Sequence, residues 1–145
     1  MNVVRARILL VGIFLSGLVL QCICILTVYS KAAITSNDVT ALLVKVLEIY
    51  SVPLAVILGG IFARPANPTA TGASEGVSSA AFWVAVGLAL VWNALLLWRG
   101  AAFSVAAFSP SIEDNVNLFA SYLEAISRAS LFLVAGALAY FFSKT

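Results

Sequence analysis

Four long apolar segments, separated by short polar stretches, dominate the chain. They span approximately residues 8–29, 40–63, 80–98 and 117–142. Each is long enough to cross the hydrocarbon core of a bilayer as a helix, which takes roughly 17 to 25 residues. Because the connections are short, we expect consecutive helices to run antiparallel. The pattern predicts an all-α integral membrane protein, in which residues 1–145 form one four-transmembrane-helix bundle with up-down antiparallel topology and short loops.

Two regions between the apolar segments have a different character. Residues 64–79 are rich in Pro, Gly, Ala, Ser and Thr and have no periodicity, which predicts a flexible loop. Residues 101–108 are apolar but too few to cross a membrane alone. They either lengthen the third helix or lie at the membrane interface, and the sequence leaves both alternatives open.

Composition agrees with a lipid environment. Of the 145 residues, 63% are hydrophobic and 10% are charged, whereas a soluble domain carries about 25% charged residues. The net charge of +2 is too small, and the basic residues are too scattered, for a phosphate-binding surface. We therefore expect membrane lipid as a partner and no nucleic acid.

The residues that usually carry chemistry are scarce. The sequence contains no histidine, the commonest general base and metal ligand. Cys22 and Cys24 are two residues apart in a predicted helix, so they point to nearly opposite faces and are expected to be small apolar residues. No nucleotide-binding glycine pattern, metal cluster or activated nucleophile is present in the sequence. We expect no cofactor, no bound metal and no enzymatic activity.

The positive residues in the short loops favour one orientation. With both termini inside, the cytoplasmic side carries Arg5, Arg7, Arg64 and Lys144, whereas the outer side carries Lys31, Arg99 and, near its edge, Lys45. The positive-inside rule then predicts a cell inner (plasma) membrane protein with N-in and C-in topology.

Several polar residues lie within the predicted spans, where they are costly and usually face the protein interior. At about 1.5 Å of rise per residue, one such residue or pair from each helix falls at a similar depth. We predict that they form one intramembrane polar layer, with Lys45 shallow enough to reach the surface. The members of this layer are Gln21, Glu48, Asn93, Glu124 and Arg128.

Small residues recur at four-residue spacing next to two of these polar positions. Glu48 shares a helical face with Ser51, Ala55 and Gly59, and Asn93 extends a face that includes Ala85 and Ala89. Small residues at this spacing permit close helix contact. We predict that these five small residues are helix-packing positions lining the bundle interior.

The polar layer is open to two interpretations. In the first, it is a buried network that fixes helix register and assembly. The protein is then a small polytopic membrane subunit that assembles through its helices, into a homo-oligomer or with another membrane or soluble protein. This class includes a pore and a membrane effector or anchor for a soluble partner. In the second, the chain is a small proton- or ion-coupled carrier that uses Glu48, Glu124 and Arg128.

Overall fold

The computed structural model describes residues 3–31, 34–62, 79–106 and 112–143, and within these ranges the regular structure is helical. The helices are α1 (Val3–Ser30), α2 (Ser36–Phe62), α3 (Ser79–Ala106) and α4 (Ile112–Ser143). The predicted all-α class is therefore confirmed. Each predicted segment lies mainly within one helix, and each helix begins before its apolar run, by one residue in α3 and by four or five residues in the others.

Length and apolar composition make most of these helices candidates for crossing a membrane. Three stretches qualify directly: Ile8–Ser30, Ser36–Gly59 and Phe82–Ala106. In α4, Asn115–Ala129 and Phe132–Ala139 are bent by 41° relative to each other and qualify if the bent pair is one span. The structure thus supports a membrane protein with three or four candidate spans.

The third helix continues well past its predicted end at residue 98. Residues 101–106 belong to α3, so of the two alternatives for residues 101–108 the lengthened helix is the correct one up to Ala106, and 107–108 lie outside the described residues. Asn115 of α4 donates a hydrogen bond from Nδ2 to the Ala106 carbonyl oxygen (3.2 Å). This bond satisfies one of the free carbonyls at the C-terminus of α3. Most of the predicted loop at 64–79 also lies outside the described residues.

The start of α2 is fixed by a local cap. The Thr35 hydroxyl accepts a hydrogen bond from the Asp38 backbone N–H (3.3 Å), and the Asp38 carboxylate accepts one from the Thr35 backbone N–H (3.0 Å). This reciprocal arrangement is a capping box with aspartate at its third helical position. It explains why the helix begins at Ser36, four residues before the apolar run.

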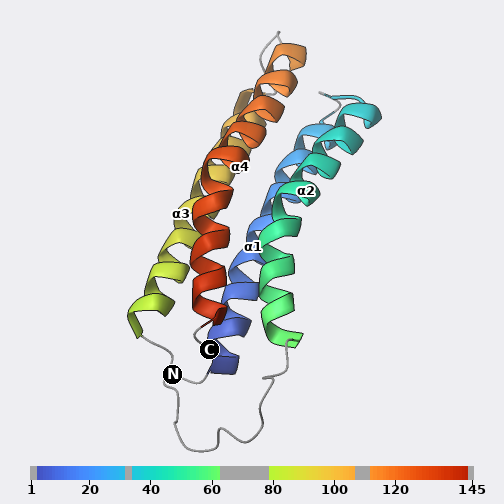
Figure 1. Cartoon of the computed structure of the whole chain (residues 1–145). Coiled ribbons are helices and arrows are strands. Elements are labelled where there is room, and N and C mark those ends of the chain that lie inside the picture. Colours follow the sequence, from blue (N-terminus) through green and yellow to red (C-terminus); the bar gives the residue numbers. More distant parts are fainter. Residues whose placement is uncertain (1–2, 32–33, 63–78, 107–111, 144–145) are drawn as a thin grey trace, which may run out of the picture.

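The helices pack as two antiparallel hairpins placed side by side (Figure 1). Within the hairpins, α1 contacts α2 and α3 contacts α4, and between them α1 packs on α3 and α2 on α4. As Figure 1 shows, α1 and α3 run in one direction and α2 and α4 in the other, so each contact between hairpins joins parallel helices. The α2 and α4 pair therefore presents two parallel helices on one side of the molecule.

Aromatic side chains occupy the centre of the core. Trp92 lies with its ring centroid 5.6 Å from that of Phe14 and 5.0 Å from that of Tyr50, so α1, α2 and α3 meet there. Many other large apolar side chains point outward; Phe132, for example, is 81% exposed and Trp98 72%. An outer surface of this kind is unusual for a protein in water, and it suits contact with lipid.

Candidate functional site

The five residues of the predicted polar layer lie in two separate places. Gln21 and Asn93 are buried between the helices, with 0% and 5% of their surfaces exposed. Glu48 and Arg128 are exposed, and Glu124 is partly exposed, on the face formed by α2 and α4. The five residues therefore do not form one interior layer. Gln21 and Asn93 form an interior amide pair, and the three charged residues belong to an outward-facing cluster.

The two buried amides form a reciprocal contact between α1 and α3. Gln21 of α1 donates a hydrogen bond from Nε2 to the Leu96 carbonyl of α3 (3.1 Å) and packs on Gly100. Asn93 of α3 packs in turn on Gly17 of α1. Each helix thus supplies one amide and one glycine. A side chain at either glycine would overlap the facing amide, so this close approach depends on both glycines.

A hydroxyl group links the interior amides to a third helix. Tyr50 of α2 donates a hydrogen bond to Asn93 Oδ1 (3.0 Å), while Asn93 Nδ2 donates to the Ala89 carbonyl of its own helix (2.8 Å). Asn93 thereby uses its oxygen and its nitrogen inside the core, where unpaired polar groups are costly. Through these bonds Gln21 connects α1 to α3, and Asn93 connects α3 to α2.

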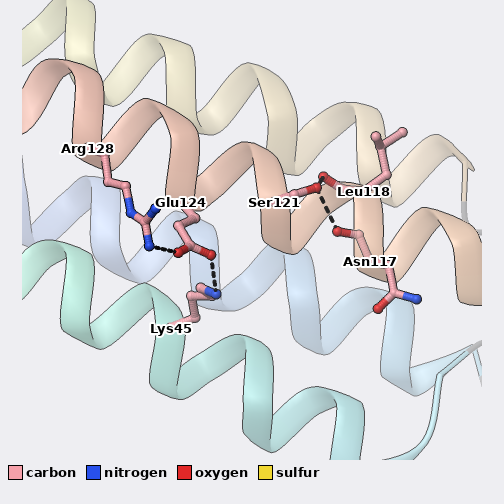
Figure 2. A network of polar contacts seen from close by, with 6 residues as sticks. All are labelled: Lys45, Asn117, Leu118, Ser121, Glu124 and Arg128. Atoms are coloured by element: carbon pink, nitrogen blue, oxygen red, sulfur yellow. Dashed lines mark hydrogen bonds and ion pairs between the residues drawn. The ribbon is translucent and has the colours of Figure 1, made fainter.

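The charged cluster consists of Lys45 and Glu48 from α2 and Glu124 and Arg128 from α4. Lys45 Nζ lies 2.9 Å from Glu124 Oε2 and joins the two helices, and Arg128 pairs with Glu124 Oε1 one turn along α4 (Figure 2). Figure 2 shows the Glu124 carboxylate between the two cations, with Ser121 on the preceding turn of α4. The Glu124 carboxylate is therefore paired with two cations, Lys45 and Arg128.

Glu48 lies beside this pairing without taking part in it. The cluster lines a hollow of about 230 Å³ that is open to the outside, together with Ile49 and Ser127. Glu48 is exposed, and within the described part of the chain its side chain has no hydrogen-bond or ion-pair partner. Glu124 therefore has two ion-pair partners, Arg128 and Lys45, and Glu48 is neither of them.

The sequence reasoning missed two participants. Tyr50 was not singled out, although a tyrosine hydroxyl in the middle of an apolar helix needs a buried partner. Lys45 was expected to reach the membrane surface, but its ammonium group pairs with the Glu124 carboxylate of the parallel helix α4.

The predicted packing residues also separate into two sets. Ala85 and Ala89 of α3 are buried, at 2% and 0% exposure, and line the core beside Asn93. Ser51, Ala55 and Gly59 of α2 are exposed, and a Cβ added at Gly59 would meet nothing within 4 Å. The small-residue stripe of α2 continues the face of the charged cluster and is not covered by this chain's own described helices.

The described residues contain no group of three or more histidine, cysteine or acidic side chains that could hold a metal ion. In comparisons with known proteins, no family model, no curated protein and no solved structure matches the chain.

Proposed function

We propose that the chain is a small polytopic membrane subunit whose four helices cross the membrane as an antiparallel bundle and assemble into a larger complex through the face of α2 and α4. In this proposal the protein lies in the cell inner (plasma) membrane with both termini inside. The protein is not an enzyme; its role is structural assembly, and this role extends to a pore, an effector or an anchor for a soluble partner.

The observation that carries the proposal is the exposure of Arg128. Its side chain is 80% exposed, although the residue lies next to the midpoint of the 32-residue α4. An arginine at the centre of a spanning helix costs about 2.5 to 3.5 kcal/mol on insertion scales, and such residues usually face protein or water. A single chain leaves this side chain directed toward lipid, whereas an assembly covers it.

The neighbouring small residues support the same face. Ser51, Ala55 and Gly59 are exposed along α2, directly beyond Glu48. Small residues in membrane helices allow backbones to approach closely, which strengthens packing and interhelical hydrogen bonding. A charged cluster bordered by a small-residue stripe combines two features typical of helix association in membranes.

The mass of the native particle tests the proposal. The purified chain, in lipid nanodiscs or a mild detergent, should have a mass of two or more copies, or should copurify with a second membrane protein. Gly59→Leu should reduce that assembly, because a large side chain separates the helices. Leu58→Ala, at the adjacent position, is the matched control and should reduce assembly less. A strictly monomeric wild-type chain without a partner would contradict the proposal.

A carrier is the second candidate, and the hollow beside the cluster favours it. The hollow holds two carboxylates and two cations within about 230 Å³, which suits exchange of a proton or cation. Glu48 is then the group that binds it. In liposomes, the carrier reading predicts a proton or solute flux that Glu48→Gln abolishes while the particle mass stays the same.

A further inference from the structure

The face of α2 and α4 is complementary to itself. We propose that its partner is a second copy of this chain, related by a two-fold axis along the membrane normal, in which Glu48 of each copy pairs with Arg128 of the other. This inference rests on the assembly function proposed above and specifies the partner and its contacts.

The charges of the cluster leave one acid and one base available to a partner. Glu124 is engaged by both Lys45 and Arg128, whereas Glu48 has no ion-pair partner among the residues described. The guanidinium of Arg128 contacts Glu124 through one nitrogen, and arginine has five N–H donors. An exclusively basic partner would leave Arg128 unmatched, and an exclusively acidic partner would leave Glu48 unmatched. A second copy supplies both charges.

The depths of the two residues satisfy the symmetry. Glu48 lies next to the midpoint of the 27-residue α2, and Arg128 next to that of the 32-residue α4. Rotation about the membrane normal does not change depth, so an acid and a base from different copies meet only when they are level within one copy. The parallel course of α2 and α4 (Figure 1) and the Lys45 to Glu124 ion pair place them at one level.

The lateral positions of Glu48 and Arg128 also satisfy the two-fold symmetry. Glu48 is on α2 and Arg128 is on α4, on the two sides of the shared face. A two-fold axis passing between these helices sets α2 of one copy against α4 of the other. The same residue pair is then made twice, as in any isologous interface.

Small side chains are exposed next to the charged residues on both helices. The exposed positions of α2 beyond Glu48 include Ser51 and Ala55, and those of α4 on either side of Arg128 include Ala125 and Ala129. These small side chains leave room for two backbones to come close. The hollow beside Glu48 then receives side chains of the second copy.

Reciprocal charge reversal tests the pairing. Two chains with different affinity tags carry Glu48→Arg and Arg128→Glu, respectively, and each is expressed alone and with the other. Alone, each variant places like charges together twice, so we expect at least a tenfold loss of dimer. Together, one contact keeps the original pair and the other carries the reversed pair. The mixed dimer should therefore recover most of the wild-type yield. Lys31→Glu, at the end of α1, is the charge control and should dimerise normally.

Cross-linking provides a measurement that does not depend on charge reversal. In a background lacking Cys22 and Cys24, chains with Ser51→Cys and chains with Ala129→Cys are coexpressed and oxidised. The proposed interface predicts a covalent mixed dimer, and Gly87→Cys on α3 in place of Ala129→Cys should give none. Absence of the mixed cross-link from an oligomer would overturn the two-fold arrangement.

The outcomes separate this inference from the proposed function. If the charge variants assemble as the wild type does, the interface lies elsewhere, and assembly stands while the inference fails. If the wild type is monomeric but recovers a different membrane protein through the same face, the second copy is the wrong partner. If the wild type neither oligomerises nor binds any membrane protein, both proposals fail.

Discussion

The side-chain amide of Asn93 on α3 lies directly against the backbone of Gly17 on α1. A Cβ added at Gly17 would lie 2.7 Å from Asn93 Cγ and 2.9 Å from the Tyr50 hydroxyl oxygen, both inside normal contact distance. Three helices converge on this glycine, and their separation there is set by the absence of a side chain. Asn93 lies close to the middle of α3 and Gly17 close to the middle of α1, so the contact lies halfway along both helices.

The first prediction is that Gly17→Ala destabilises the protein. The added methyl group must displace Asn93 or Tyr50 and break their hydrogen bond, and overpacking of this kind costs about 1 to 3 kcal/mol. Thermal unfolding in detergent, followed by circular dichroism, should show a lower midpoint. Gly12→Ala is the control, since a Cβ there meets nothing within 4 Å. Equal midpoints for the two variants would contradict the contact.

The second prediction concerns the other half of the reciprocal contact. A Cβ at Gly100 would lie 3.1 Å from Gln21 Cδ and still closer to its Oε1. Gly100→Ala should therefore lower the unfolding midpoint, and Gln21→Ala in the same chain should restore part of the loss by removing the amide. Gly87→Ala, on the exposed side of α3, should leave the midpoint unchanged. A double variant less stable than Gly100→Ala alone would refute the proposed overlap.

The helices were predictable because the apolar runs are long and clearly bounded. Their ends were less predictable, since polar caps such as Thr35 and Asp38 and the apolar continuation of α3 to Ala106 extend them beyond the hydropathy pattern. Hydropathy counts apolar residues and does not detect the local hydrogen bonds that determine where a helix starts.

The faces of the helices were harder to predict than their positions. Periodicity placed Glu48 with Ser51 and Asn93 with Ala89, and both groupings are observed. It did not distinguish the inner face from the outer one, because in lipid an outward face is as apolar as the core. Asn93 is buried and Glu48 is exposed. This difference depends on which helices are neighbours, and the periodicity of a single helix carries no information about its neighbours.

The third prediction concerns topology. If four spans cross the membrane, residues 36 and 74 lie on opposite sides. Single cysteines introduced as Ser36→Cys and Ser74→Cys, in a background lacking Cys22 and Cys24, should react with an impermeant thiol reagent added from opposite faces of sealed vesicles. With the termini inside, the position 74 variant should be labelled from the cytoplasmic face. Labelling of both variants from one face would exclude four spans.

The fourth prediction separates the two cations that hold Glu124. Lys45 connects α2 to α4, whereas Arg128 pairs with Glu124 within α4. Lys45→Met should therefore lower the thermal midpoint of the monomer more than Arg128→Met, which leaves the link between the helices in place. Arg128→Met should instead reduce the proportion of dimer, because it removes the group offered to Glu48 of a second copy.

Combining these variants with Glu124→Gln tests whether the charges act as a pair. In a background that carries Glu124→Gln, the ion pair between Lys45 and Glu124 is already lost, so Lys45→Met removes no further pairing. The Lys45→Met loss should therefore shrink when Glu124→Gln is also present. The two readouts, the unfolding midpoint and the native mass, should then move independently: Lys45 variants change mainly the midpoint and Arg128 variants mainly the mass. If Arg128→Met changes neither quantity, the arginine contacts nothing that matters to the fold or to assembly, and the face of α2 and α4 is not an interface.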